Sequence, residues 1–240
     1  MLGSKLLHFD SLNSTNDYLI NLCKTYRMTE SIIVIADMQI KGRGRFNKKW
    51  YSEDGLFFSF LLKSDDFLDT FFINTLTSLA LIKVLRKVNI QAMVKYPNDI
   101  IVSQKKISGI LIENIISNHH HYLITGVGLN VNNVIFPKHI DGAVSMNIIK
   151  DVQYDKMALL NDFFLEFSLL QSSSLKGKNH IIKQYLDVLY GYQEYVFCNY
   201  KGERMKVKVL SISNKGILTI QYDNAVIKTV SYMDIQFLLS

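Results

Sequence analysis

The sequence is poor in cysteine, proline and tryptophan, and it has no long hydrophobic run. Its 240 residues include two cysteines, two prolines and one tryptophan. Cys23 and Cys198 lack the spacing of a metal site or a redox pair, so we expect reduced, buried thiols. No apolar segment is long enough to cross a bilayer, and the N-terminus MLGSKLLHFD lacks the features of a signal peptide. These absences argue against a secreted or membrane-spanning protein and favour a cytoplasmic one.

What the sequence does contain is ample apolar material and an excess of positive charge. Hydrophobic residues make up 48% of the chain, and the formal net charge is +6 with a pI near 9.1. The length allows one domain of ordinary size and a small second one. The charge favours an anionic ligand or an acidic macromolecular partner, and at this point it does not exclude nucleic acid.

A basic loop with two glycines follows the first long apolar segment. The run 31–38 predicts a strand, and residues 41–50 then read KGRGRFNKKW, with five cations. Glycine lets the backbone lie close to a ligand, and arginine presents a planar fork of donors that suits phosphate and carboxylate. The loop therefore predicts a site for a polyphosphate or an activated acyl group. A solvated surface loop would have the same composition.

A helix start with free polar groups precedes this loop. A short strand over 5–9 leads to Ser14, which forms a capping-box pattern with Asp17, and an apolar stripe at helical spacing follows. Capping alone would explain the pattern. Because a helix N-terminus presents unpaired N–H groups, Ser14, Thr15 and Asn16 could also face a small polar ligand.

A second polar cluster lies at a bend between two strand-like segments. Pro97 interrupts the run 93–102 and leaves Lys95, Asn98 and Asp99 together at the bend. An ordinary turn accounts for Asn98 and Asp99. It does not account for a lysine inside an apolar strand, so the cluster is a second candidate for ligand binding.

Glycines interrupt the two strands predicted after this bend. One strand over 106–113 contains Gly109, and the next, over 122–132, contains Gly126 and Gly128. Glycine inside a strand often marks the close approach of a ligand or of another backbone. We therefore expect the sheet to have a glycine-lined floor of ligand size.

Long apolar segments predict the core. The run 55–62 predicts a central strand, and 70–88 predicts a long buried helix. Two further helices, over 155–170 and 181–189, are expected to pack on them. From 194 onward, short β-rich runs alternate with turn signals, which is the pattern of a small barrel.

Five motifs occur in an order that matches one enzyme family: Ser14-Thr15-Asn16 at a helix start, GRGR-x4-W, lysine-aromatic-PND, K-x-x-G and G-x-G-x-N. The chain thereby resembles the biotin protein ligases over nearly its whole length. The resemblance implies an α+β fold, with a mixed β-sheet flanked by helices as in class II aminoacyl-tRNA synthetases and a small C-terminal SH3-like β-barrel. It also implies a catalytic domain over 1–190 and the SH3-like domain over 191–240.

The resemblance implies two successive half-reactions in one pocket. Biotin and ATP would form biotinyl-5'-AMP with release of pyrophosphate, with Mg2+ bound through the ATP phosphates. The biotinyl group would then pass to one lysine of a biotin carboxyl carrier protein domain, as in acetyl-CoA carboxylase. A monomer or a homodimer is expected. Bifunctional relatives carry an N-terminal DNA-binding domain, whereas this chain starts directly at the catalytic unit, so DNA is not an expected partner.

The resemblance also assigns site residues by position. Positioned cations stabilise the charge that develops during transfer at phosphorus, so mostly basic residues are expected to carry catalysis, with one carboxylate that could also bind Mg2+. The expected catalytic residues are Arg43, Lys106, Lys95 and Asp99, the last also being the Mg2+ candidate. The expected biotin contacts are Ser14, Thr15, Asn16, Gln39, Arg43, Gly44, Arg45, Lys106 and Gly109. The expected ATP or adenylate contacts are Arg43, Arg45, Trp50, Lys95, Asn98, Lys106 and Asn130.

Three positions carry residues that differ from those common in the family. Tyr96 stands where a tryptophan is usual, which keeps an aromatic face and adds a hydroxyl. Phe46 and Asn47 stand where many relatives have an arginine and a glycine. The first change is expected to be tolerated, and the other two bear on how the loop closes.

Two other functions remain open on the sequence. A lipoate-protein ligase also activates its acid as an adenylate on a similar fold, although the GRGR loop and the KYPND bend favour biotin. A basic nucleic-acid-binding module would use the Arg/Lys loop to contact backbone phosphates, with steep salt dependence.

Overall fold

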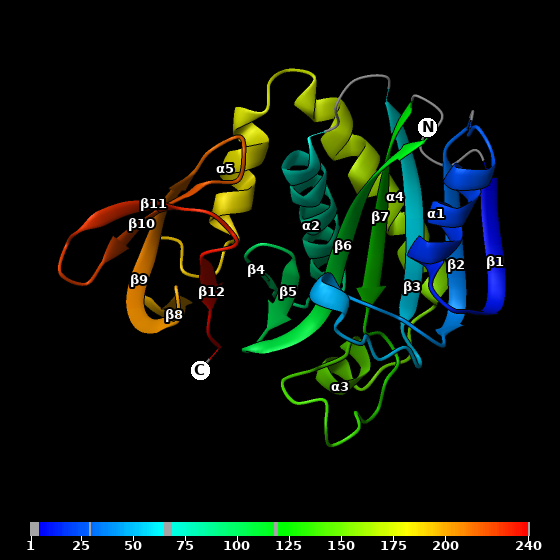
Figure 1. The fold of residues 1–240 in the computed structure, drawn as a ribbon. Helices are drawn as coiled ribbons and strands as arrows, with labels where there is room; N and C mark the ends of the chain where they lie inside the picture. The colour runs from blue at the N-terminus through cyan, green and yellow to red at the C-terminus, as the bar shows by residue number, and fades with distance from the viewer. Residues whose placement is uncertain (1–4, 29, 65–68, 118–119, 240) are drawn as a thin grey trace.

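The computed structural model describes residues 5–28, 30–64, 69–117 and 120–239, which form two β-sheets and the helices around them (Figure 1). The larger sheet has seven strands in the order β1-β2-β3-β7-β6-β5-β4. Only β1 and β2 pair in parallel there, and the other neighbours are antiparallel. Its strands are β1 (Lys5–Leu12), β2 (Ile32–Gln39), β3 (Leu56–Ser64), β4 (Met93–Lys95), β5 (Asp99–Val102), β6 (Lys105–Ser117) and β7 (His120–Leu129).

The smaller sheet is antiparallel and lies at the C-terminal end of the chain. Its strand order is β11-β10-β9-β8-β12, and among the described residues its edge strands β11 and β12 do not pair with each other. The α+β class with two sheets is confirmed, but the second sheet is open rather than closed into a barrel. Its edge strands are short, with four residues in β11 and three in β12. The strands are β8 (Val196–Tyr200), β9 (Glu203–Ile212), β10 (Leu218–Tyr222), β11 (Ile227–Val230) and β12 (Ile235–Phe237).

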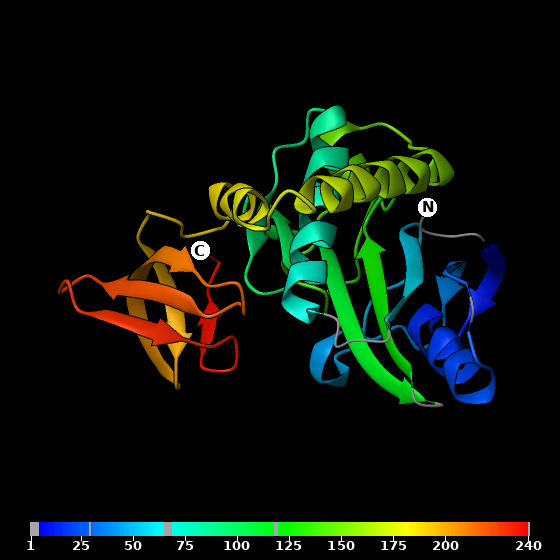
Figure 2. The same ribbon diagram turned by 90° about the horizontal axis from the view of Figure 1, so that it is seen from above.

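Helices cover the two faces of the large sheet unequally (Figure 2). On one face α2 and α4 pack on Ile33, Ile35, Phe58 and Phe60 and enclose the main core. On the other face α1 packs on the alternate strand residues, among them Val34, Leu61 and Ile124. The helices are α1 (Thr15–Thr25), α2 (Thr70–Lys87), α3 (Met146–Lys150), α4 (Lys156–Ser174) and α5 (Asn179–Asp187).

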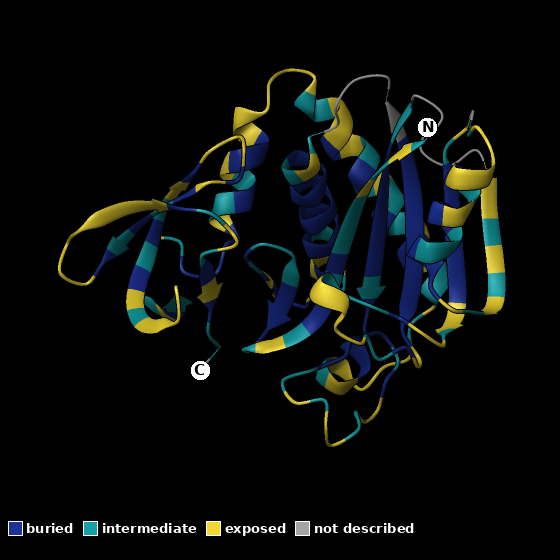
Figure 3. Ribbon diagram, in the orientation of Figure 1, coloured by how far each residue is buried: buried dark blue, intermediate teal, exposed yellow. Residues whose placement is uncertain are grey.

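The predicted core segments are confirmed. The central position of β3 explains why its sequence is apolar on both faces. Helix α2 is buried along most of its length because it lies between the sheet and α4, as its dark colour in Figure 3 shows. Its C-terminal Lys87 forms ion pairs with Asp162 and Glu166 of α4. The short helix α3, which the sequence analysis did not predict, follows the last strand of the large sheet.

Both cysteines are buried and unpaired, as predicted, and burial raises the pKa of each thiol to about 11. No helix among the described residues is long and apolar enough to cross a membrane.

The second sheet is joined to the β4–β5 end of the large sheet by direct contacts. The backbone of Val94 pairs with the carbonyl of Val188 and the amide of Tyr190, on the approach to the second sheet. The hydroxyl of Tyr96 donates a hydrogen bond of 2.7 Å to the carbonyl oxygen of Gly216. The bend at Pro97 therefore faces the C-terminal sheet as well as the large one.

Candidate active site

A cavity of about 1330 Å³ opens on the sheet face that carries α1. A pocket for one small ligand typically measures roughly 300–1,000 Å³, so this cavity has room for two. The C-terminal sheet and its loops contribute Asn199, Lys201 and Tyr232 to its wall. All the site residues predicted from the sequence line this cavity, namely Ser14, Thr15, Asn16, Gln39, Arg43, Gly44, Arg45, Trp50, Lys95, Asn98, Asp99, Lys106, Gly109 and Asn130.

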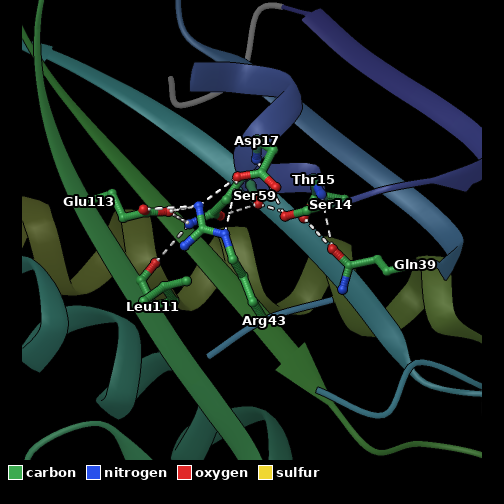
Figure 4. Close-up of polar contacts among 9 residues, drawn as sticks. Ser14, Thr15, Asp17, Gln39, Arg43, Ser59, Leu111 and Glu113 are labelled. Atoms are coloured by element: carbon green, nitrogen blue, oxygen red, sulfur yellow. Dashed lines mark hydrogen bonds and ion pairs between the residues drawn. The ribbon is translucent and has the colours of Figure 1, made fainter. Parts of the chain in front are cut away.

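One end of the cavity is a hydrogen-bonding network of uncharged hydroxyl and amide side chains at the N-terminus of α1, beside the ion pairs of Arg43 with Asp17 and Glu113 (Figure 4). Ser14 caps the helix, and its hydroxyl accepts from the amide of Asp17, which confirms the predicted cap. The amide and hydroxyl of Thr15 both donate to Oε1 of Gln39, at 2.9 and 3.2 Å. The side-chain nitrogen of Asn16 donates to Glu113 at 2.8 Å.

Ser59 on β3 completes this network, and the sequence analysis did not single it out. Its hydroxyl lies 2.6 Å from the hydroxyl of Thr15 and 2.6 Å from Oδ1 of Asn16, and the residue is fully buried. A lone polar residue inside the apolar run GLFFSFLL was the available signal. Because side chains alternate along a strand, Ser59 points to the α1 face while Phe58 and Phe60 point into the main core.

Arg43 is held by two carboxylates that the sequence did not assign to the site (Figure 4). Its Nη2 lies 2.6 Å from Asp17 on α1 and 2.9 Å from Glu113 on β6, and its Nε donates to Asp17 at 3.1 Å. Burial lowers the pKa of the guanidinium, but the hydrogen bonds to Asp17 and Glu113 outweigh it and leave the pKa above its ordinary value. Two negative charges therefore surround one positive charge, and Nε and Nη2 of Arg43 already donate to the two carboxylates.

Arg45 has different surroundings, although it lies two residues away. Its Nη1 donates to Oδ1 of Asn98 at 3.2 Å, and its guanidinium lies over the rings of Phe46 and Tyr232 at 5.0 and 4.9 Å. Within the described part of the chain it forms no ion pair with a carboxylate. Its positive charge is thus available to an anionic ligand in the cavity.

Trp50 and Asn16 lie directly on the strand glycines. A Cβ atom added to Gly128 would lie 2.5 Å from the Trp50 ring, and one added to Gly109 would lie 2.9 Å from it. A Cβ atom at Gly126 would overlap the amide of Asn16. The glycines were expected to form a ligand-sized floor, and all three line the cavity, where they also let the side chains of Trp50 and Asn16 approach the sheet.

Three charged residues converge at the other end of the cavity. The β4–β5–β6 register places Lys95 opposite Asp99 and Asp99 opposite Gly109. The ammonium of Lys106 lies 2.6 Å from Asp99 and 5.0 Å from the centre of a Trp50 ring. Burial lowers the pKa of Lys95, and the nearby charges of Lys106 and Lys48 lower it further, against the opposing effect of Asp99.

Asn130 is buried at the back of this end. Its side-chain nitrogen donates to the carbonyl oxygens of Val144 and Lys106, at 3.0 and 3.4 Å. The residue therefore ties β6 to Val144, which directly follows the cavity-wall segment 139–143. Within the described ranges, no group of three or more His, Cys, Asp or Glu side chains could hold a metal ion by itself.

The family model and the most similar curated proteins point to the same family. The sequence model of the biotin/lipoate A/B protein ligase family matches residues 8–130. The chain is 31% identical over 177 residues to the bifunctional ligase/repressor BirA of Bacillus subtilis, covering 70% of this chain and 54% of that protein. It is 25% identical over 245 residues to the human biotin–protein ligase, covering 95% of this chain and 34% of that one. The chain thus spans about half the length, or less, of these relatives.

Solved structures show the same similarity over the whole chain. The structure of a biotin protein ligase from Aquifex aeolicus in complex with biotin and ATP superposes with a TM-score of 0.83 at 26% identity. The match covers 99% of this chain and 100% of that one. The two sheets described above are therefore an arrangement already seen in a solved structure.

Proposed function

Because the chain belongs to the biotin/lipoate A/B protein ligase family, we propose that it is a biotin protein ligase, which joins biotin to ATP and then transfers the biotinyl group to a lysine of a carrier domain. One observation carries the proposal. A single cavity combines a neutral hydrogen-bonding end with a cationic end. The Aquifex aeolicus structure in complex with biotin and ATP supports the same pair of ligands here.

The neutral end suits the ureido ring of biotin. That ring has one carbonyl acceptor and two N–H donors, which hydroxyl and amide side chains can match. Thr15, Asn16 and Ser59 present such groups, and the surrounding network holds them in position. Trp50 was expected to contact the adenylate, but because it lies on Gly128 we assign it instead to an apolar wall for the biotin ring system.

The cationic end suits the phosphates of ATP. In the first step a carboxylate oxygen of biotin attacks the α-phosphorus and forms a new P–O bond. The bond from phosphorus to the bridging oxygen breaks, and pyrophosphate leaves with the electron pair. Lys106, Lys95 and Arg45 would stabilise the charge on the phosphate oxygens as it shifts.

The two loop arginines would then have separate roles. Arg43 already binds two carboxylates, so we assign it to holding the loop against α1 and β6 beside the biotin end. Arg45 has no carboxylate partner among the described residues, so it is the loop cation proposed to contact the adenylate phosphate. This division shifts the phosphate role from Arg43, where the sequence placed it most strongly, to Arg45.

Mg2+ fits this end as a companion of ATP. Asp99 offers one carboxylate beside Lys106, without the further acidic ligands of a protein-only metal site. Magnesium commonly takes one or two carboxylates together with phosphate oxygens, and when bound it neutralises phosphate charge. Lys106 would exchange its contact with Asp99 for a phosphate oxygen when ATP enters.

In the second step the ε-amine of the carrier lysine attacks the acyl carbon of the adenylate. A C–N bond forms, the bond from the acyl carbon to the phosphate oxygen breaks, and AMP leaves. The attacking amine must lose a proton, and Asp99 is the proposed acceptor once Lys106 has moved to the phosphate. The carrier is proposed to be a biotin carboxyl carrier domain.

The test is biotin-dependent exchange of labelled pyrophosphate into ATP. We expect exchange with biotin and none with lipoate. Lys106→Ala should lower the exchange rate by about 100-fold or more, because it removes a cation that acts on the transition state. Lys105→Ala, at the exposed neighbouring position, is the matched control and should stay within twofold.

A second assay follows biotin onto a purified carrier domain, with a carrier whose acceptor lysine is replaced by arginine as the control. Exchange with lipoate instead of biotin would replace this proposal by a lipoate ligase. Tight oligonucleotide binding without any exchange would replace it by a nucleic-acid-binding function.

A further inference from the structure

Phe46 has a conformation and an exposure that its own chemistry does not favour. Its φ is 55°, in the left-handed region that is unfavourable for bulky side chains, and 79% of the residue is exposed. Asn47 has φ 56°, which asparagine tolerates far better. Burial does not compensate for the strain at Phe46, and its ring instead makes a contact with a charged neighbour.

That contact is with Arg45. The Arg45 guanidinium lies 5.0 Å from the centre of the Phe46 ring and 4.9 Å from that of Tyr232. Its Nη1 also donates to Asn98, whose own amide donates to the carbonyl of Ile110 on β6. Arg45 is therefore restrained by two aromatic rings and one amide.

Tyr232 brings the C-terminal sheet into this contact. It lies in the turn between β11 and β12, where the hydroxyl of Ser231 donates to Asp234 at 2.8 Å. The carbonyl of Asp234 accepts from the amide of Lys201 at the β8–β9 turn. The ring is thus carried by a turn that is itself fastened to the second sheet.

We propose that Phe46, Arg45 and Tyr232 form a clasp that fastens the basic loop to the C-terminal sheet and positions Arg45 over the cavity. Phe46 and Tyr232 are positioning residues, since both act through Arg45. The inference rests on the proposed function for its catalytic consequence: the clasp slows release of the adenylate. Its structural part, the fastening of the loop, stands without that function.

A neighbouring contact supports the clasp. Tyr96 also reaches the C-terminal sheet, through its hydrogen bond to Gly216. The Arg45–Tyr232 contact and the Tyr96–Gly216 hydrogen bond thus both lie where the site meets the second sheet.

The experiment compares Tyr232→Ala, Tyr232→Phe and Phe46→Ala in the full chain. Hydrogen exchange over residues 41–50, measured without ligand, reports the fastening. Release of preformed biotinyl-adenylate, together with KM for ATP and kcat, reports the positioning. Phe197→Ala is the matched control, because it removes a similar ring from beneath Arg204 at 4.5 Å, away from the cavity.

For Tyr232→Ala we expect faster loop exchange and a 3- to 30-fold increase in both adenylate release and KM for ATP, together with a fall in kcat, because Arg45 also acts on the charge of the transition state. Tyr232→Phe keeps the ring and should match the unmodified chain, as should Phe197→Ala. Phe46→Ala should show the same effects as Tyr232→Ala, and its exposed position keeps the fold intact.

Two results would overturn the inference. One is loop exchange in Tyr232→Ala and Phe46→Ala equal to that of the unmodified chain. The other is an equal loss in Tyr232→Phe, which would assign the effect to the hydroxyl. If the unmodified chain forms no adenylate, the proposed function fails, while the hydrogen-exchange comparison still decides whether the clasp exists.

Discussion

At the residue scale, two arginines in one loop differ because their partners differ. The side chain of Arg43 is only 22% exposed and forms ion pairs with Asp17 and Glu113. Arg45 instead lies over two aromatic rings and donates a hydrogen bond to the amide of Asn98. A guanidinium whose donors are occupied by carboxylates can hold a loop in position. One that is held by aromatic faces keeps a positive charge that an anionic ligand can bind. The same side chain thus serves two purposes two residues apart.

Neutralising the carboxylates beside Arg43 should weaken biotin binding at the hydrogen-bonding end of the cavity. We expect Glu113→Gln to raise KM for biotin by about 10-fold, because Glu113 binds both Arg43 and Asn16. Asp17→Asn should have a smaller effect of about 3-fold, since Asp17 is more exposed. Steady-state exchange assays measure both. Asp37→Asn is the control, because its exposed pair with His8 lies outside the cavity, and an equal loss there would contradict the assignment.

Lys95 should reduce stability at neutral pH. Burial lowers its pKa, so between that lowered pKa and the ordinary value of about 10.4 the unfolded chain binds more protons than the native one, and stability rises with pH. Lys95→Met should therefore be more stable at pH 7 by about 0.5–2 kcal/mol, with a smaller gain at pH 10. Urea unfolding at both values measures this. A gain that does not change with pH would contradict it.

At the element scale, strand alternation decides which side chains reach the site. On β3, Phe58 and Phe60 face α2 and α4 while Ser59 faces α1, and on β7 Gly126 and Gly128 lie on the site face. A one-residue shift of either strand would exchange core and site residues. The long antiparallel ladders that join β3 to β7 and β7 to β6 oppose such a shift.

Adding a side chain on β7 should displace the indole that lies on it. Gly128→Ala would place a Cβ atom 2.5 Å from Trp50, so the ring must move toward solvent. Trp50 is the sole tryptophan, so its fluorescence reports this movement directly, and we expect a red-shifted emission and at least a 10-fold rise in KM for biotin. Trp50→Phe in the same background offers a smaller ring and should recover part of the affinity. Unchanged emission would refute the packing argument.

At the scale of the whole molecule, the two sheets meet at the bend between β4 and β5. Tyr96 is buried there, and burial raises the pKa of its hydroxyl, which stays protonated and donates to Gly216. The cavity uses residues from both sides of this junction. The site therefore depends on how the C-terminal sheet docks.

Removing the Tyr96 hydroxyl should weaken this docking. We expect Tyr96→Phe to reduce the free energy of unfolding by about 1–3 kcal/mol, because the carbonyl of Gly216 is left without its partner. Chemical denaturation measures the change. Tyr195→Phe, which removes a 3.3 Å hydrogen bond within the C-terminal sheet, is the control and should cost less than about 0.5 kcal/mol. Equal losses of unfolding free energy in the two variants would contradict a particular role of the Tyr96–Gly216 hydrogen bond in docking the second sheet.

The features that could be predicted from the amino-acid sequence alone are those that depend on local pattern. Hydrophobic periodicity predicted β3 and α2, side-chain chemistry predicted the cap at Ser14, and the ordered motifs predicted residues that line one cavity. These features follow from neighbours along the chain, so they can be read without coordinates.

The partners of those residues depend on how distant segments of the chain fold together. Arg43 finds its carboxylates 26 and 70 positions away, and Arg45 finds Tyr232 on another sheet. The order of the strands and the docking of the second sheet set these contacts, and neither leaves a periodic signal in the sequence. The glycines of β6 and β7 line the cavity, as predicted, but for the same reason the sequence did not show that Trp50 and Asn16 lie on them.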